Sequence, residues 1–315
     1  MRQQKGIALI TILVMVALAT IIAATIAKRQ QHTFDNTAYL MRQNQALQYA
    51  KSAESFISEL LVQDSENSAN VDHLQELWAR PMPPFPVEDG VISGQLQDES
   101  GKFNLNTLIK ADGTPNENAL KLFENLLLRL GLPTTLSQAV IDWQDPDDVT
   151  IGAMGAESAY YQGLPQPYMA ANQAFNRVEE LRMVRGFEGK NYELILPFVA
   201  ALPDIGTKIN INTAAPMLLA SIDAKLDVNA VAMALKSKQD KMEHFSNVSE
   251  LMALPPFDGA TPEAKILATA LFDVKSSYFK ANIEVVLSER KRQLTSHLMR
   301  KNKRVQVYAR SLAPF

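Results

Sequence analysis

The chain has 315 residues, a formal net charge of −3 at pH 7 and no cysteine. This length is enough for a membrane segment and about two domains. The slightly acidic balance argues against a general nucleic-acid-binding protein, whose binding surface would be basic. Because cysteine is absent, disulfides and thiolate metal sites are excluded. The histidines lie far apart in the sequence, so no zinc site is expected; they are His32, His73, His244 and His297.

An uncharged apolar run over residues 7–27 follows Lys5-Gly6 and precedes Lys28-Arg29. As a helix, such a run can cross a hydrocarbon core about 30 Å thick. It could be a plain membrane anchor or a secretory signal peptide, although it is longer than the usual apolar region of about 7–15 residues in a signal peptide. The third interpretation starts from Gly6-Ile7, which resembles a class III leader that prepilin peptidase cuts after Gly6. We favour this interpretation, in which the mature chain keeps its anchor.

Residues 7–61 contain no proline or glycine, so one helix is predicted to continue from the apolar run into the soluble part. An apolar stripe at helical spacing, formed by Tyr49, Ala53, Phe56, Ile57 and Leu60, is expected to pack on a globular head. The proline-rich residues 80–86 are predicted to break regular structure. Residues 91–96 and 102–105 are predicted to form a hairpin, joined by the turn at 98–101.

The middle of the chain, residues 107–274, has the pattern of short helices and contains a hidden repeat. Residues 102–107 (KFNLNT) match residues 208–213 (KININT). With a constant offset of 70, residues 175–189 match residues 245–259 at a Phe, a Val, a Glu-Leu pair and a Phe-x-Gly turn. We therefore predict a duplicated helix-hairpin-helix or SAM-like module. The alternative is two similar helix starts with Asn and Glu caps.

The C-terminal part changes to a period of two, which predicts strands over residues 278–287, 293–299 and 305–309. The predicted fold class is α+β, with a pilin-like long N-terminal helix on a small antiparallel sheet and a large all-α insertion. The predicted divisions are a leader (1–6), a membrane helix (7–29), the rest of the helix with the first strands (30–106), the insertion (107–274) and the last strands (275–315).

An acidic stretch in the insertion could hold a cation. Asp142, Asp145, Asp147 and Asp148 fall within seven residues, and Glu157 follows. These carboxylates repel one another unless a cation or solvent screens them, and oxygen-rich loops suit calcium. The spacing does not follow the EF-hand pattern. The acidic stretch is therefore either a calcium site, with Asp142, Asp145, Asp147 and Glu157 as candidate ligands, or a solvated loop.

Signatures of enzymes are missing from the sequence. It has no G-x-S-x-G, no P-loop and no dinucleotide fingerprint, and Ser158 is not a nucleophile elbow. Asp142 and Asp145 would be a carboxylate pair without a visible base, so we expect no catalysis. The turns at 184–187 and 254–257 resemble those of helix-hairpin-helix modules, but two prolines in the second lack the N–H that a phosphate needs. A packing role is favoured over DNA binding.

Eight Lys or Arg residues lie between positions 290 and 310. Because they flank the predicted strands, we interpret them as solvated, with contact to an acidic partner as the other interpretation.

Taken together, these features resemble minor pseudopilin K of bacterial type II secretion, also called general secretion pathway protein K. The resemblance covers nearly the whole chain and rests on Lys5-Gly6, the helix from Ile7, GKFNLN (101–106), IDWQD (141–145), GAE (155–157), Tyr161, Glu180-Leu181 and ININT (209–213). Two positions depart from the pattern. Ile7 stands where many pilin-like proteins begin with Phe, and Ser158 stands where an acidic residue is expected.

The resemblance implies a non-catalytic subunit of the bacterial inner membrane, with a single pass, a cytoplasmic N-terminus and a periplasmic head. It implies cleavage by prepilin peptidase and N-methylation of Ile7. It also implies a complex with minor pseudopilins I and J and contact with other type II secretion components. This complex is expected to cap the pseudopilus tip and to help initiate assembly of the pseudopilus. The pseudopilus in turn supports export of folded periplasmic proteins across the outer membrane. Calcium in the insertion is likewise implied, and no nucleic-acid partner is expected. A membrane-anchored helix-hairpin-helix protein for DNA uptake is the alternative function.

Thr11 is the fifth residue after the expected cut, where most pilin-like proteins have Glu. A carboxylate in lipid costs about 2.5 kcal/mol or more, so a Glu that pairs with a neighbour's free amine favours docking against a subunit already in place. Thr11 cannot ionise, and its hydroxyl is expected to bond to a carbonyl one turn earlier in its own helix. We therefore predict the first subunit of a fibre rather than a repeating one.

Overall fold

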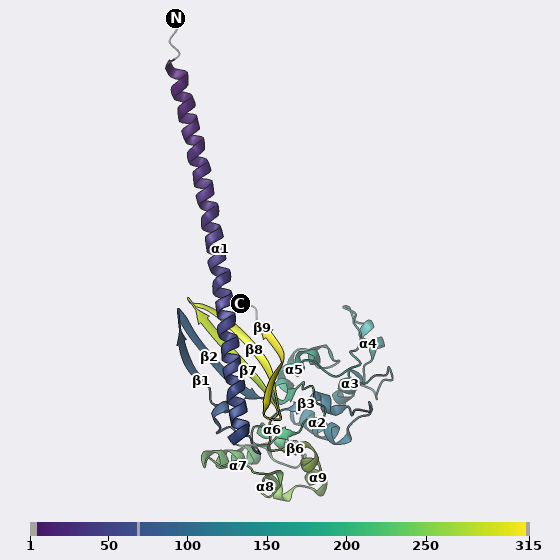
Figure 1. Ribbon diagram of the computed structural model, residues 1–315. Coiled ribbons are helices and arrows are strands. Elements are labelled where there is room, and N and C mark those ends of the chain that lie inside the picture. The colour runs from purple at the N-terminus through teal and green to yellow at the C-terminus, as the bar shows by residue number, and fades with distance from the viewer. Residues whose placement is uncertain (1–4, 68–69, 313–315) are drawn as a thin grey trace.

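The computed structural model describes residues 5–67 and 70–312 (Figure 1). Its longest element is α1 (Lys5–Asn67), one helix of 63 residues, so the prediction of a continuous helix is confirmed. The helix from Ile7 is long and apolar enough to cross a membrane, and its most apolar stretch is not buried in the protein. Most of the expected leader, residues 1–4, lies outside the described residues.

The C-terminal half of α1 packs on the sheet through small side chains. Ala46, Ala50, Ala53, Ile57 and Leu61 are buried there. Three alanines allow the helix backbone to approach the strands closely. The predicted stripe was therefore wrong in one member, since Phe56 is 58% exposed.

The sheet has five antiparallel strands in the order β1-β2-β7-β8-β9. The strands are β1 (Met82–Val87), β2 (Gly90–Asp98), β7 (Tyr278–Leu287), β8 (Arg290–Lys301) and β9 (Arg304–Leu312). The three C-terminal strands agree with the predicted ones. Because β2 pairs with β7 over its whole length, the entire stretch 99–277 is inserted between two neighbouring strands.

Two expectations about residues 80–105 were wrong. The proline-rich segment contains β1, an edge strand whose register shifts between Met82 and Phe85. Proline is tolerated there because an edge strand has N–H groups that need no partner. Residues 102–105 do not form a hairpin with β2; β3 (Phe103–Asn104) instead pairs in parallel with β4 (Val199–Ala200). Both long edges of β2 are already occupied, by β1 and β7.

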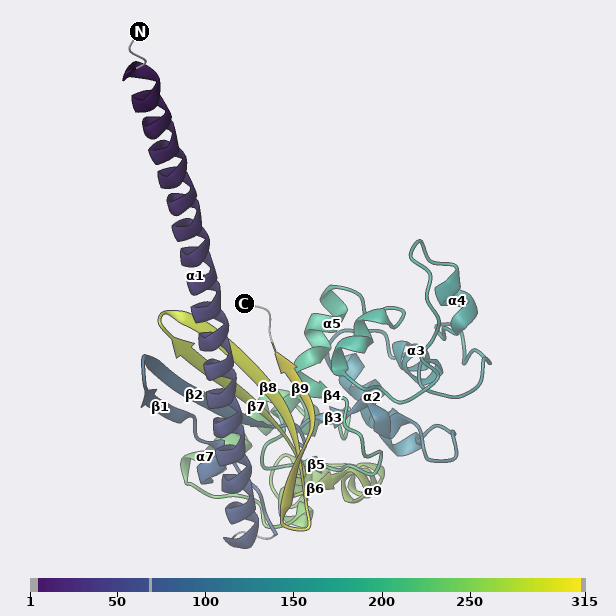
Figure 2. The same ribbon diagram turned by 45° about the horizontal axis from the view of Figure 1, so that its top comes forward.

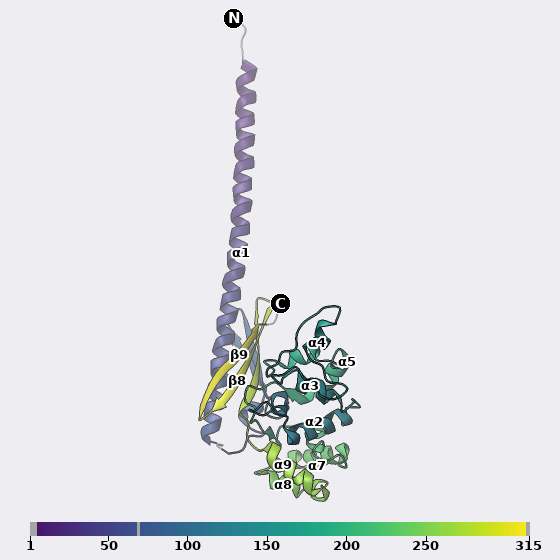
Figure 3. The same cartoon turned by 90° about the vertical axis from the view of Figure 1, so that its right-hand side faces the viewer.

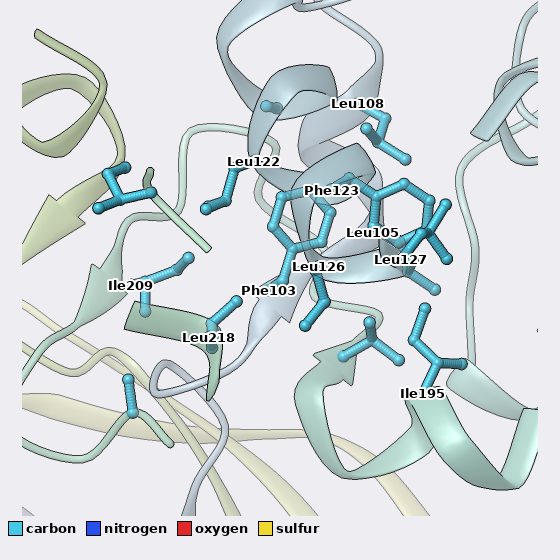
Figure 4. Packing of buried hydrophobic residues seen from close by; sticks show 14 of the residues in the cluster. Phe103, Leu105, Leu108, Leu122, Phe123, Leu126, Leu127, Ile195, Ile209 and Leu218 are labelled. Carbon is cyan, nitrogen blue, oxygen red and sulfur yellow. The ribbon is translucent and has the colours of Figure 1, made fainter. Parts of the chain in front are cut away.

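The inserted helical part lies on the side of the sheet opposite α1 (Figure 3). Its elements are η2 (Leu105–Leu108), α2 (Glu117–Arg129), α3 (Leu136–Asp142), α4 (Ser158–Gln162), η3 (Val178–Met183), α5 (Lys190–Ile195), η4 (Leu196–Phe198), β5 (Ile209–Asn210), α6 (Pro216–Ala220), α7 (Val228–Asp240), α8 (Val248–Met252), η5 (Phe257–Gly259), α9 (Pro262–Leu271) and β6 (Phe272–Asp273); η1 (Leu77–Ala79) precedes β1. Figure 4 shows its core, where the rings of Phe103 and Phe123 stack at 5.3 Å. This core is separate from the one under α1.

The two copies of the sequence repeat make equivalent contacts. Each begins a short parallel strand pair, β3 with β4 and β5 with β6. The Asn106 side chain donates to the Phe175 carbonyl oxygen and accepts from its N–H, and Asn212 makes the same two bonds to Phe245. The repeated sequence therefore forms the same pair of hydrogen bonds in both copies. The assignment to helix-hairpin-helix or SAM-like modules stays a prediction.

Asp98, at the end of β2, connects the sheet to the inserted part. Its carboxylate accepts from the Ser100 N–H at 2.7 Å and from the hydroxyls of Thr213 and Ser276. Burial raises the pKa of Asp98 to about 6 although these hydrogen bonds act to lower it. No local pattern indicated the role of this residue, because the two hydroxyls come from distant parts of the sequence.

Candidate metal centre

Three of the predicted ligands meet in one buried cluster. Asp142 is the last residue of α3, Asp145 lies in the turn that follows, and Glu157 immediately precedes α4. All three residues are buried, and one carboxylate oxygen from each lies within 4.8 Å of the others. The loop between α3 and α4 thus brings together carboxylates from its two ends.

The loop between Asp145 and Glu157 folds back over Asp142. The Ile151 N–H donates to both carboxylate oxygens of Asp142, at 3.1 and 3.2 Å. A side chain at position 155 would place its Cβ only 2.3 Å from Asp142 Oδ2, so this close approach requires Gly155. The Arg185 guanidinium donates to the Gly155 carbonyl oxygen at 3.0 Å. The loop is therefore held in place from both sides.

Electrostatics in the cluster favour a bound cation. Burial, followed by repulsion from the neighbouring carboxylates, raises the pKa of Asp145 and of Glu157 to about 7, and burial also raises the pKa of Asp142. Asp145 Oδ1 and both carboxylate oxygens of Glu157 are buried with no hydrogen-bond donor in the described part of the chain. Buried polar atoms without a partner are costly, and oxygen atoms of this kind are the ligands that calcium takes. The residues present thus fit a calcium ion.

Asp147 does not join the other predicted ligands. Its side chain is exposed and accepts from the Val149 N–H at 2.8 Å, so it stabilises its own turn, and it is absent from the group of converging oxygens. Ser158, the first residue of α4, stands where the resemblance called for an acidic residue. Three carboxylates therefore define the cluster instead of the four expected.

A second group of carboxylates, which sequence reasoning missed, is partly compensated by a cation of the protein itself. Asp64, Asp72 and Glu76 also converge within 4.8 Å, near the end of α1. The Arg300 guanidinium donates to Asp64 at 2.7 Å and pairs with Asp72. This cluster therefore holds its own cation and ties α1 to β8. Because Arg300 comes from the other end of the chain, no local pattern could have indicated the pairing.

The predicted processing and assembly residues lie at the exposed end of α1. Gly6 and Ile7 fall in its first turn. The Thr11 hydroxyl donates to the Ala8 carbonyl oxygen at 2.9 Å, which confirms the expected bond within the same helix. Cleavage between Gly6 and Ile7 stays a prediction.

The fold defines an α+β class of protein in which a helix long enough to span a membrane packs on an antiparallel sheet, and a large helical part is inserted between neighbouring strands. Models of the family "Type II secretion system (T2SS), protein K" match residues 101–204 and 209–275. The chain belongs to this family, as the sequence resemblance predicted. The comparisons give no support to the alternative of a DNA-uptake protein.

Relatives of similar length agree with this assignment. Type II secretion system protein K of Aeromonas hydrophila is 34% identical, over 95% of this chain and 94% of the relative. The protein K of Pseudomonas aeruginosa is 34% identical over 99% of this chain and 93% of the relative. A crystal structure of the GspK-GspI-GspJ complex from the type 2 secretion system of enterotoxigenic Escherichia coli contains a chain that superposes with a TM-score of 0.78. The two chains are 25% identical, over 89% of this chain and 100% of the other.

Proposed function

We propose that this protein is a minor pseudopilin that assembles with minor pseudopilins I and J at the tip of the type II secretion pseudopilus. One observation carries the proposal: the fold matches, over the full length of the other chain, a chain from the crystal structure of a GspK-GspI-GspJ complex. At the tip the protein helps to initiate the pseudopilus, which supports export of folded periplasmic proteins across the outer membrane. Its role is structural rather than catalytic.

The N-terminus supports the position at the tip. The Thr11 hydroxyl forms its hydrogen bond within its own helix. A Glu at this position would instead pair with the free amine of a subunit that is already assembled. The inserted part adds bulk on the side of the sheet away from α1 (Figure 3). We expect this bulk to obstruct the stacking of a further subunit. Both features suit a first subunit, present once.

We propose that Asp142, Asp145 and Glu157 bind a structural calcium ion. Their buried, unpartnered oxygens support this proposal. When bound, calcium supplies two positive charges, which offset most of the charge of the three carboxylates, and fixes the loop between α3 and α4. Asp147, which the sequence suggested as a fourth ligand, instead contributes negative charge from the surface.

Maturation and topology follow from the same assignment. We propose that prepilin peptidase cuts between Gly6 and Ile7 and that the new N-terminus is methylated. The apolar stretch of α1 then anchors the protein in the inner membrane, with the N-terminus cytoplasmic and the head in the periplasm. The continuous course of α1 from the apolar run to the sheet supports this arrangement (Figure 1).

Co-purification tests the proposed function. The full chain, extracted from membranes in mild detergent, should bring down minor pseudopilins I and J of the same cell in equal amounts. A chain that purifies without either of them would contradict the proposal. A major membrane protein of unrelated function serves as the control for non-specific capture.

A further inference from the structure

Arg185 contacts the chain on both sides of Glu157. It lies in the turn between η3 and α5, and its guanidinium donates to the Gly155 carbonyl oxygen at 3.0 Å. The same guanidinium lies 4.7 Å from the centre of the Tyr160 ring, and the backbone N–H of Arg185 donates to the Tyr161 hydroxyl at 3.2 Å. Arg185 therefore fixes the end of the loop before Glu157 and the helix α4 that follows it.

The Glu157 side chain depends on this backbone for its position. Glu157 is 3% exposed, and neither of its carboxylate oxygens has a hydrogen-bond donor in the part of the chain that the structure describes. The negative charges of Asp142 and Asp145 act to push the Glu157 carboxylate out of the cluster. Because no side-chain hydrogen bond of its own opposes this repulsion among the described residues, the backbone around Glu157 has to be held from elsewhere.

The loop between Asp145 and Glu157 lies at the edge of the inserted part. Helix α4 and the loop before it project away from the sheet and from α1 (Figure 2). Helix α3 holds the middle of the loop, since the Gln138 side-chain oxygen accepts from the Met154 N–H at 2.9 Å. Arg185, which comes from a different segment, holds the end of the loop that leads into Glu157.

The second copy of the sequence repeat lacks this arrangement. With the offset of 70, Pro255 stands where the first copy has Arg185. Proline offers neither a backbone N–H nor a side-chain donor. No group of converging carboxylates lies within residues 209–275, all of which the structure describes. Arg185 and the carboxylate cluster therefore occur together in the first copy, and the second copy has neither.

We propose that Arg185 is a positioning residue for the calcium site, which fixes Glu157 beside the aspartates of the cluster before the ion binds. The turn at 184–187 thus acts within the protein instead of on a phosphate. Because the role concerns a bound ion, it rests on the proposed calcium site. A guanidinium near the cluster repels a cation, so removing Arg185 would tighten calcium binding if its charge decided the outcome. Loss of positioning instead weakens binding, since part of the binding free energy is then spent on ordering the loop.

Calcium titration of the full chain in mild detergent tests this role. After chelation, Arg185→Met should raise the Kd for calcium about tenfold, the lower end of the effect of losing a residue that orients a metal ligand. Arg185→Lys, which keeps a donor but loses the planar contact with Tyr160, should raise the Kd by less. Arg182→Met is the matched control and should leave the Kd unchanged, because Arg182 packs on Tyr192 of α5, 4.4 Å from its ring centre. An unchanged or lower Kd in Arg185→Met would overturn the role.

Proteolysis of the chelated protein provides a readout that needs no ion. Without the Arg185 side chain, α4 should open more often, so chymotrypsin should cleave after Tyr160, which is 37% exposed, several-fold faster than in the parent protein. Mass spectrometry of the fragments identifies this cut, and Arg182→Met should be cut at the parent rate. Equal rates in Arg185→Met and the parent would show that Arg185 does not hold this segment.

The same measurements separate this role from the calcium site itself. If the parent protein binds no calcium, the proposed calcium site fails and the role of Arg185 fails with it. If the parent protein and Arg185→Met bind calcium equally tightly, the calcium site stands and only the role of Arg185 is wrong. If Arg185→Met does not fold, Arg185→Lys decides, and a Kd equal to that of the parent protein would contradict the role.

Discussion

Arg310 on β9 donates through two nitrogens to the two carboxylate oxygens of Glu54 in α1, each at 2.8 Å. Glu54 is buried and also accepts from the Ser296 hydroxyl on β8. Burial acts to raise the pKa of Glu54, but the hydrogen bonds and charge of Arg310 hold it below its ordinary value. The pair thus fixes the long helix to the last strand of the sheet.

Replacing Arg310 tests this attachment. Arg310→Ala leaves the Glu54 carboxylate buried with fewer partners, and should lower the free energy of unfolding by about 1–2 kcal/mol, because the half-exposed arginine is partly screened by water. Chemical denaturation of the soluble head at pH 7 measures the change. Arg304→Ala, on the exposed start of the same strand, should stay within about 0.5 kcal/mol. Since the folded pKa of Glu54 is lowered, its contribution should be lost as the pH falls below 4.5. Equal stability of Arg310→Ala and the parent protein would refute this role.

Asp98 should make the free energy of unfolding fall as the pH rises, which is the opposite of the pH dependence expected for Glu54. Its pKa rises from 3.8 to about 6 on folding, so the folded state binds the proton more tightly than the unfolded state. The stability that this proton contributes is fully present below about pH 4 and is lost as the pH rises through about 6, with a loss of about 3 kcal/mol at most.

Denaturation of the parent protein and of Asp98→Asn between pH 4 and 8 measures this contribution as their difference. The decline should be smaller in the variant by this contribution, because Asp145 and Glu157, whose pKa values are also raised, still add to it. Asp112→Asn, which changes an exposed carboxylate, should retain the full decline. A parallel pH profile for the parent protein and Asp98→Asn would show that Asp98 ionises as freely in the folded state as in the unfolded chain.

Calcium should stabilise the chelated protein. Binding to the folded state alone adds about 2.7 kcal/mol when calcium exceeds its Kd a hundredfold, so the melting temperature should rise. Asp145→Asn and Glu157→Gln should abolish the rise, because each removes a carboxylate from the converging group. Asp147→Asn should keep most of it, since that side chain lies at the surface. An unchanged melting temperature at millimolar calcium would leave the acidic loop without a metal role.

Processing of the N-terminus gives a prediction that is independent of the head. The intact mass of the membrane-extracted protein should correspond to loss of residues 1–6 and addition of one methyl group at Ile7. Gly6→Leu should leave the precursor uncut, because a bulky side chain blocks the peptidase. A mature N-terminus near residue 28 would instead identify a conventional signal peptide.

Local patterns in the sequence were enough to predict the long helix, the three C-terminal strands and the carboxylates that converge in the insertion. They failed where the outcome depended on distant segments. The prolines around Phe85 suggested a break, but the segment forms an edge strand because β2 offers it a partner. Likewise, Phe103 pairs with Val199 rather than with β2, whose two edges are taken by β1 and β7. Arg300 gathers Asp64 and Asp72 from the opposite end of the chain, which no spacing rule could anticipate.

The position of the protein in the pseudopilus is tested most directly by gold labelling of assembled fibres. An epitope inserted in the exposed turn between β8 and β9, at Asn302, should be labelled without disturbing the strands. We predict one gold particle at one end of each fibre and no secretion or initiation of fibres when the gene is deleted. Labels at regular intervals along the shaft would contradict the assignment to the tip.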